Sequence, residues 1–471
     1  MSGSDSSNAH SFSVNRRALM AGTAAVALSA ALPANAKARP GPLNFLFIMA
    51  DDMGVADLSC YGRRDYRTPV LDGLARQGML FTTAYANSAV CTATRVALAT
   101  GRYQYRLPIG LEEPLGQRPV GLPAQHPTIA SLLRKQGYAT SLLGKWHLGS
   151  LPDYGPLQSG YDEFWGLRGG GIDYFSHDYA GRADLWDGDT PIQQVGYMTD
   201  LLADRTIETM QRHGKAKKPW LISLHFTAPH WPWEGPDDQA ESARLGKLTS
   251  PTAAMHYDGG TQATYAAMVY QIGRILAALT KSGQRENTVV VFTSDNGGER
   301  FSDTWPFTGK KTELLEGGLR IPAIVRWPGL TRPGSTSDAQ IMSMDWLPTF
   351  LAAAGGSADP AYPLDGLDLR PALAGAPLPE RSLYWRYKNL AQRAVRRGKW
   401  KYLSIAGNEF LFDVEADPLE RGNLKNRYPD KFAELVSAWK AWDATMLPLD
   451  PASSTFGHSG AELADHFGIK P

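Results

Sequence analysis

The chain of 471 residues is poor in cysteine and has no run of charge of one sign. Its two cysteines cannot build the disulfide framework on which small secreted domains depend. A net charge of +1 without a basic or acidic run gives no sign of a nucleic acid partner or of electrostatic membrane binding. We find no internal repeat and no long low-complexity tract. What remains is the composition of a soluble globular protein, with 43% hydrophobic and 20% charged residues.

The first 36 residues have the pattern of an export signal. Arg16 and Arg17 precede an apolar run, 21–32, and residues 34–36 have the small-x-small form of a signal-peptidase site. The paired arginines predict twin-arginine export to the periplasm or out of the cell, with an ordinary signal peptide or an uncleaved anchor as alternatives. Because the apolar run is too short to span a bilayer comfortably, we expect no stable membrane insertion after cleavage.

Two apolar runs of strand length each end in oxygen-bearing side chains. Run 44–50 leads into Asp51 and Asp52, and run 287–294 leads into Asp295 and Asn296. Continuous apolar runs predict strands buried on both faces of a mainly parallel sheet, where ligands bind at the carboxyl ends of the strands. Since calcium and magnesium prefer such oxygen donors, we interpret the four residues as a shared divalent metal site. Carboxylates that cap a helix are the alternative.

Basic and histidine side chains follow two further runs. Run 138–144 predicts another strand and leads to Lys145 and His147, which alternation places on the same face of an extended segment. Run 219–226 predicts a buried strand that precedes His230. His225, inside that run, is interpreted as a satisfied core histidine. A Lys-x-His pattern by itself is more typical of ordinary surface residues. These residues become candidates for an active site only together with the metal site.

Cys91 is followed by Ala93 and Arg95 in the stretch 88–102. A buried structural thiol and a disulfide to Cys60 are the ordinary interpretations of this cysteine. The spacing Cys-x-Ala-x-Arg, however, resembles the sulfatase signature Cys-x-Pro/Ala-x-Arg. The string 144–149 resembles the second sulfatase signature, and Ala-Pro-His-x-Pro at 228–232 resembles a further family pattern. The resemblance is greatest to the arylsulfatase and N-acetylgalactosamine-6-sulfatase branch, and it covers nearly all of the chain after residue 36.

This resemblance implies a chemistry for the residues above. In the family a maturation enzyme converts the signature cysteine to formylglycine, and one calcium ion binds beside it. The implied calcium ligands are Asp51, Asp52, Cys91, Asp295 and Asn296. The implied catalytic residues are Cys91, Arg95, Lys145, His147, His230 and Lys311. The implied sulfate-binding residues are Lys145, Ser176, His230 and Lys311.

The register at Lys311 and the order of proton transfers also come from the resemblance. Counting back from Glu316, the sulfate-binding lysine of the family falls on Lys311 rather than Lys310, and Thr312 replaces the usual glycine. The implied reaction is attack by a hydroxyl of the hydrated formylglycine with Asp295 as base. The alcohol leaves with a proton from His230 or Lys311, and sulfate is released with His147 as base.

The resemblance also implies an α/β, alkaline-phosphatase-like fold. We expect a large, mostly parallel central sheet flanked by helices, with a smaller C-terminal antiparallel sheet and one helix. The expected divisions are a signal peptide at 1–36, a catalytic domain at 37–378 and a C-terminal α+β subdomain at 379–471. Residues 354–380, rich in Gly, Ala and Pro, form a plausible linker.

The predicted function is therefore hydrolysis of a small-molecule or carbohydrate sulfate ester, with a formylglycine-generating enzyme as a partner. A phosphate or phosphonate ester hydrolase of the same superfamily is the first alternative. A non-catalytic, calcium-dependent binder of sulfated glycans is the alternative from another class. Which alcohol carries the sulfate depends on the shape of the pocket loops.

Overall fold

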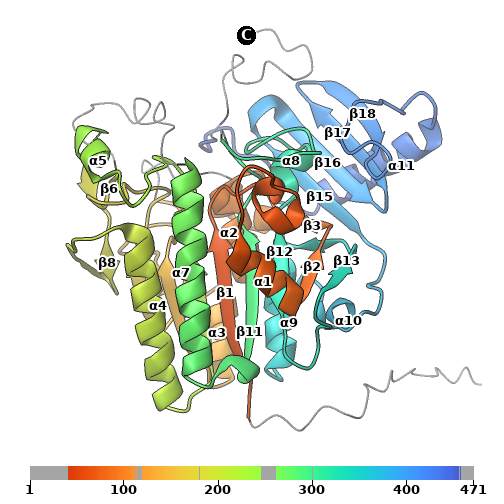
Figure 1. The fold of residues 1–471 in the computed structure, drawn as a ribbon. Helices are drawn as coiled ribbons and strands as arrows, with labels where there is room; N and C mark the ends of the chain where they lie inside the picture. The colour runs from red at the N-terminus through yellow and green to blue at the C-terminus, as the bar shows by residue number, and fades with distance from the viewer. Residues whose placement is uncertain are drawn as a thin grey trace, which may run out of the picture. The chain divides into compact units, whose positions relative to one another are not determined.

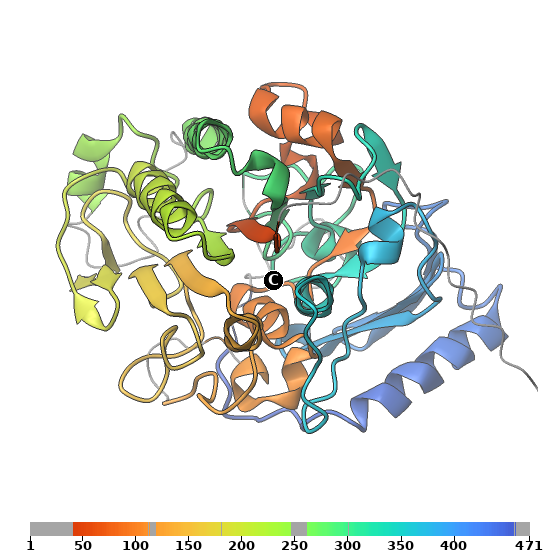
Figure 2. The same cartoon turned by 90° about the horizontal axis from the view of Figure 1, so that it is seen from below.

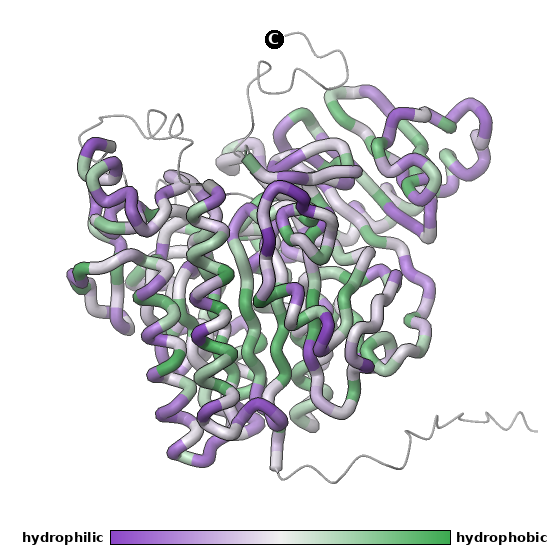
Figure 3. Tube along the Cα trace, viewed as in Figure 1, coloured by the Kyte–Doolittle hydropathy of each residue, from purple (hydrophilic) through white to green (hydrophobic). Residues whose placement is uncertain are grey.

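Strand β1 (Asn44–Ala50) is the centre of the larger sheet, and all its residues are buried. In this computed structural model β1 pairs in parallel with β10 (Trp220–His225) and β11 (Thr288–Ser294). Beyond β10, β4 (Ala139–Gly144) and β5 (Glu163–Gly166) continue the parallel arrangement. Helices cover both faces of this sheet, which is why its strands are apolar throughout rather than alternating (Figure 3).

Both edges include antiparallel pairings, although β13 pairs with β2 in parallel, and the ten strands have the order β13-β2-β12-β11-β1-β10-β4-β5-β8-β9. One edge is formed by β12 (Ala323–Arg326), β2 (Met79–Phe81) and β13 (Ser335–Ser337). The other is formed by β8 (Trp186–Asp187) and β9 (Thr190–Pro191). The large, mostly parallel sheet expected from the sequence is confirmed.

Helices lie on both faces of the sheet (Figures 1 and 2), and each face contributes to its own apolar core. Phe45 and Phe47 of β1 face the core formed with α2 (Cys91–Thr100), α3 (Ile129–Lys135) and α9 (Trp346–Ala353). Leu46 and Ile48 face the core formed with α1 (Pro69–Gln77), α4 (Met198–Lys215) and α7 (Thr261–Lys281). Adjacent residues of a strand point to opposite faces, so one strand serves both cores.

A second, antiparallel sheet follows in the C-terminal part of the chain. It consists of β15 (Ser382–Tyr387), β16 (Gln392–Arg397), β17 (Trp400–Ile405) and β18 (Asn408–Asp413). Helix α11 (Pro429–Asp443) packs on one face through Leu435 and Trp439. The other face packs Trp385 and Leu403 against Leu314 of the main body. This sheet and its helix also match the expectation.

The structure describes residues 41–455 and 457, except for 112, 114–118, 180, 246–260 and 300. The proposed signal at 1–36 lies outside the described residues. Within them, no helix is long and apolar enough to cross a membrane. Shorter elements are β3 (Ala84–Tyr85), β6 (Asp178–Tyr179), β7 (Arg182–Ala183), α5 (Gln239–Leu245), α8 (Glu316–Leu319), β14 (Ile341–Met342) and α10 (Arg370–Leu373).

Candidate active site

The carboxyl ends of β1 and β11 bring four oxygen-bearing side chains into one buried cluster. The backbone N–H of Asp52 donates to Oδ1 of Asp295 at 3.1 Å, and Nδ2 of Asn296 donates to Oδ1 of Asp52 at 2.8 Å. Asp51, which follows β1 directly, is also fully buried. Asp52 has a φ of 65°, and this left-handed turn begins the loop that leaves the strand. We name these four residues the acidic cluster.

Cys91 is the first residue of α2, and its side chain points at the acidic cluster. Its Sγ lies 3.5 Å from Oδ1 of Asp51 and 3.9 Å from Oδ1 of Asp52. Burial raises the pKa of the Cys91 thiol well above its usual value. Both Cys91 and Cys60 are free, so the disulfide considered from the sequence does not form.

Arg95 lies one helical turn after Cys91 and therefore on the same side of α2. Its Nη2 lies 2.8 Å from Oδ2 of Asp295, and its Nη1 donates to the backbone oxygen of Lys145 at 3.2 Å. Burial would raise the pKa of Asp295, but the charges of Arg95 and Lys145 outweigh it and lower that pKa. Asp295 is therefore held as a carboxylate.

Two lysines contribute positive charge, each to a different carboxylate of the acidic cluster. Nζ of Lys145 lies 2.7 Å from Oδ2 of Asp51, and Nζ of Lys311 lies 2.6 Å from Oδ2 of Asp52. Burial opposes the charged form of both lysines, yet the neighbouring aspartates raise both pKa values. The structure thus places Lys311 in the cluster, whereas Lys310 is half-buried beside it.

Both predicted histidines lie near the acidic cluster, but the backbone conformation at His147 differs from the one that the sequence predicts. His147 has a φ of 58°, so the segment after β4 is not extended there, and the alternation expected from the sequence is wrong at this residue. A hydrogen bond from its backbone N–H to the carbonyl of Arg168 fixes the bend. Burial, then the charge of Lys145, lowers the pKa of His147 well below its usual value. The imidazole is therefore neutral at neutral pH.

His230 follows β10 and contacts the acidic cluster directly. Its Nε2 lies 3.5 Å from Oδ2 of Asp52, and its Nδ1 lies 2.8 Å from the backbone oxygen of Trp231. Burial lowers the pKa of His230 to about 3, despite the nearby Asp52 carboxylate. Like His147, this histidine is neutral in the site.

Ser176 is the one predicted site residue that the structure does not bring to the cluster. It is exposed, and its Oγ accepts from the backbone N–H of Asp178 at 3.4 Å. Together with Phe175 and His177 it lines a separate open cavity of about 820 Å³. Its assignment to sulfate binding stays a prediction.

Two buried glutamates near the cluster were missed in the sequence. Oε1 of Glu113 accepts from the backbone N–H of Thr92 at 3.1 Å, next to Cys91. Burial raises the pKa of Glu299 to about 7, and the charge of Lys311 opposes that rise. The position of Glu299, three residues after Asn296, could have suggested its place. Glu113 follows no strand and no recognisable motif, so the sequence carried no signal for it.

The donors present fit a divalent cation. Asp51, Asp52, Cys91 and Asp295 each offer a ligand atom, and these atoms all lie within 4.8 Å of one another. Oδ1 of Asn296 is buried and accepts no hydrogen bond from any described residue. Such an orphaned oxygen costs free energy unless a partner binds it, and a cation is a suitable partner. Carboxylate and amide oxygens are the ligands that calcium prefers.

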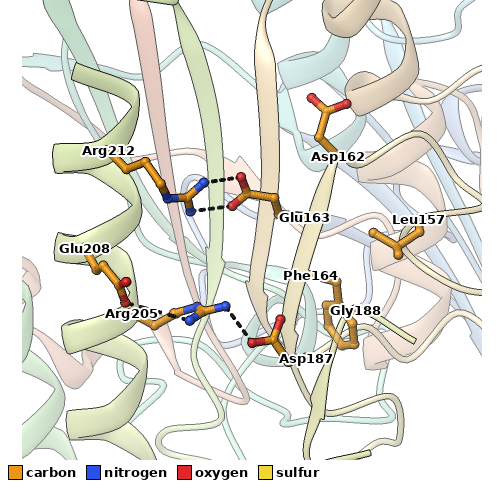
Figure 4. Close-up of a pocket in the computed structure, with 9 residues that line it drawn as sticks. All are labelled: Leu157, Asp162, Glu163, Phe164, Asp187, Gly188, Arg205, Glu208 and Arg212. Atoms are coloured by element: carbon orange, nitrogen blue, oxygen red, sulfur yellow. Dashed lines mark hydrogen bonds and ion pairs between the residues drawn. The ribbon is translucent and has the colours of Figure 1, made fainter. Parts of the chain in front are cut away.

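A charged surface cavity of about 340 Å³ lies elsewhere, at the amino end of β5 (Figure 4). Its charged residues pair with one another: Arg212 with Glu163, and Arg205 with Asp187 at 2.8 Å. Because parallel sheets place their ligands at the carboxyl ends of the strands, the acidic cluster is the better candidate for the active site.

Comparison with known proteins agrees with this site. The sulfatase family model matches residues 43–357. Arylsulfatase A of Homo sapiens is 31% identical and covers 89% of this chain and 90% of its own length. N-acetylgalactosamine-6-sulfatase of Canis lupus familiaris is 30% identical and covers 77% of this chain and 72% of its own.

Solved structures share the fold. A crystal structure of Ps i-CgsB in complex with k-i-k-neocarrahexaose has a TM-score of 0.79 and 27% identity, and covers 90% of this chain and 97% of its own. A phosphonate monoester hydrolase of Agrobacterium radiobacter, with a TM-score of 0.60 and 20% identity, is similar in fold alone and covers 85% and 95%. The fold is thus alkaline-phosphatase-like, as expected. Since the family model spans well over half of the sequence, this chain belongs to the sulfatase family, whose members are sulfuric ester hydrolases.

Proposed function

We propose that this protein hydrolyses the sulfate monoester of an aryl or carbohydrate alcohol with a formylglycine formed from Cys91 and one bound calcium ion. The supporting observation is that Sγ of Cys91 lies 3.5 Å from Asp51 in a fully buried cluster that also holds two lysines. A sulfate ester carries one negative charge, and its oxygens shield the sulfur. Attack therefore requires fixed positive groups around those oxygens and a nucleophile in line with the leaving group.

The calcium ligands in this proposal are Asp51, Asp52, Asp295, Asn296 and the side chain at position 91. Calcium, when bound, would add positive charge at the sulfate and lower the pKa of a neighbouring hydroxyl. Formylglycine would supply, as its hydrate, a hydroxyl where the unmodified residue has a thiol.

Lys145, Lys311 and His230 bind the sulfate oxygens in this proposal. Both lysines are charged, because neighbouring aspartates raise their pKa values against the effect of burial. The one N–H of neutral His230 is at Nδ1, where it donates to the backbone oxygen of Trp231, so Nε2 would donate to a sulfate oxygen only when the ring takes up a second proton. Ser176 is assigned to the same group by sequence resemblance alone.

Three residues move protons. Asp295, kept ionised by Arg95, accepts the proton of the attacking hydroxyl. Lys311 donates to the oxygen of the leaving alcohol, because neutral His230 carries no additional proton to give. His147 accepts a proton as sulfate is released, since it is neutral and its buried Nδ1 has no partner among the described residues.

The modification is tested by the mass of one peptide. Trypsin should release residues 77–95 as a single peptide that holds Cys91 and excludes Cys60. Conversion of the thiol to an aldehyde makes this peptide lighter, blocks its alkylation and lets it react with hydrazines. Cys91→Ala should remove these signals together with the activity. A fully active enzyme whose peptide is entirely alkylated at Cys91 would contradict the proposal.

The ester class is tested by parallel assays on an aryl sulfate and an aryl phosphate. We expect a higher kcat/KM for the sulfate, because the chain belongs to the sulfatase family. A preference for the phosphate or a phosphonate would favour the first alternative. Binding of sulfated glycan without turnover, after co-expression with a maturation enzyme, would favour the non-catalytic binder.

We further propose export through residues 1–36 and a division of the remaining chain at residues 378 and 379. Changing Arg16 and Arg17 to lysine should retain the precursor in the cytoplasm, because twin-arginine export depends on that pair. Undiminished activity in the periplasm would exclude this route. The division rests on the separate antiparallel sheet that begins at Ser382.

A further inference from the structure

Lys311 lies on a loop between β11 and β12 that contains little regular structure of its own. Two neighbouring residues of the loop make backbone hydrogen bonds, one within the loop and one to the segment before α2. The backbone N–H of Lys311 donates to the carbonyl of Gly298 at 2.9 Å, and that of Thr312 donates to the carbonyl of Ala89 at 2.8 Å. These bonds fix the backbone at the start of the turn. The residues after Thr312 are held by other contacts.

Thr312 is strained in this turn. Its φ is 74°, in the left-handed region that a β-branched residue rarely adopts. A glycine would accept this conformation without steric cost. The loop therefore does not favour its own conformation at the residue next to Lys311, and contacts from outside must maintain it.

Gln392, the first residue of β16 in the C-terminal sheet, supplies such contacts. Its Nε2 donates to the backbone oxygen of Thr312 at 2.8 Å, and its Oε1 accepts from the backbone N–H of Leu314 at 2.8 Å. The side chain is 1% exposed, and Nε2 also donates to the backbone oxygen of Asn389 at 3.1 Å. One amide thus bridges both sides of the turn that follows Lys311.

The same end of the β15–β16 hairpin lies close to the acidic cluster. Tyr387, the last residue of β15, is the register partner of Gln392 and is buried. Tyr387 lines a small cavity together with Val90, which precedes Cys91, and with Glu113, which offers a carboxylate oxygen within 4.8 Å of Sγ of Cys91. The C-terminal sheet is therefore a wall of the active site.

We propose that Gln392 is a positioning residue for Lys311, through which the C-terminal sheet controls how tightly the site binds sulfate. This inference rests on the proposed role of Lys311 in sulfate binding. Gln392 touches neither the acidic cluster nor any reacting atom, and it acts by holding the backbone on which Lys311 is carried. Strain at Thr312 makes that support necessary.

The test compares Gln392→Met with Gln340→Met by steady-state kinetics on an aryl sulfate, with inorganic sulfate as inhibitor. Methionine keeps the volume of glutamine but removes both hydrogen-bonding groups. Gln340 is a matched control, because its Nε2 also links the main body to the C-terminal sheet, at the carbonyl of Gly398, 2.8 Å away. We expect Gln392→Met to raise KM and the inhibition constant of sulfate about tenfold, as the loss of partners for buried backbone groups implies. Gln340→Met should change neither constant.

Thr312→Gly separates positioning from general stability. In the Gln392→Met background it should restore much of the sulfate affinity, because glycine adopts the left-handed conformation without the clamp. A Gln392→Met enzyme with a lower Tm and unchanged sulfate constants would overturn the proposal, as would equal effects of the two methionine variants. If Gln392→Met does not fold, Gln392→Glu keeps the acceptor for Leu314 and loses the donor to Thr312, so its sulfate constants decide in the same way.

Lys311→Ala distinguishes failure of this inference from failure of the proposed function. If Lys311→Ala weakens sulfate inhibition and the Gln392 variants do not, only the positioning role is wrong. If Lys311→Ala leaves sulfate inhibition unchanged, the proposed role of Lys311 is wrong and the positioning role falls with it.

Discussion

Nζ of Lys145 lies 2.7 Å from Oδ2 of Asp51, and neither side chain is exposed to solvent. The two charges stabilise each other, because burying one unpaired charge costs far more free energy than burying the pair. The contact also joins β4 to β1, strands between which β10 lies in the sheet. It therefore ties two strand ends together and contributes to the stability of this end of the sheet.

Removing the positive partner should destabilise the protein. Lys145→Met should lower the free energy of unfolding by about 3–5 kcal/mol, since it removes the nearest cation of the buried Asp51 carboxylate and leaves only Arg95, at 3.6 Å. Urea unfolding measures this change. Lys399→Met is the control, because Lys399 pairs with Asp413 at the surface and should contribute little. Equal losses in the two variants would contradict the buried-pair argument.

The two adjacent lysines should differ strongly in their effect on activity. Lys311→Ala should lower kcat/KM about 100-fold or more, because it removes a charge placed at the sulfate. Lys310→Ala should have a much smaller effect, since Lys311 is the lysine within 2.6 Å of Asp52. Thermal unfolding of both variants shows whether either loss reflects misfolding. The reverse order of activities would assign the sulfate to Lys310.

Calcium should bind through Asn296. After calcium has been removed with a chelator, calorimetric titration should show weaker calcium binding in Asn296→Ala than in the wild type. The variant lacks the side-chain oxygen Oδ1, which has no hydrogen-bond partner among the described residues. Calcium at a hundredfold excess over its Kd should stabilise the wild-type fold by about 2.7 kcal/mol. Asn287→Ala is the control, as Asn287 lies before the other end of β11 and donates to the carbonyl of Pro42. Unchanged affinity in Asn296→Ala would remove this residue from the metal site.

Stability should fall on acidification, in part because of His225. Burial, then the charge of Arg95, lowers the pKa of His225 to about 3, whereas the unfolded residue titrates near its ordinary value of about 6.5. Between these two values the unfolded chain binds a proton that the folded chain does not. The free energy of unfolding should therefore fall by about 1.4 kcal/mol per pH unit as the pH decreases through this window.

His225→Asn tests this prediction by urea unfolding at several pH values between about 7 and 5. The variant should lose less stability per pH unit than the wild type, by the share that His225 contributes. Its absolute stability is not the readout, because the substitution also changes packing beside Phe47. An identical slope in the two proteins would show that His225 titrates normally.

The strands and their acidic ends could be predicted because the signal is local. Run 44–50 coincides with β1, and run 287–294 exceeds β11 by one residue. A buried strand of a parallel sheet is apolar on both faces, so the first charged residue marks its end. The meeting of Asp51 with Asp295 then follows from the parallel pairing of the two strands.

Features set by tertiary contacts could not be predicted in this way. The bend at His147 depends on a hydrogen bond to Arg168, which the chain reaches only after another loop and β5. Glu113 reaches Thr92 through an irregular loop without periodicity. Gln392 lies 80 residues after Thr312 in the sequence, and only the packing of the C-terminal sheet against Leu314 brings the two residues into contact.

Cys91 is 1% exposed, and every residue of α2 is buried. An enzyme that oxidises this thiol cannot reach it once α2 has packed between the sheet and the C-terminal part. The proposed conversion of Cys91 would therefore compete kinetically with folding during synthesis. The active fraction of a preparation would then be fixed by the relative rates of the two processes in the producing cell, and treatment of the folded protein with the maturation enzyme should not raise it.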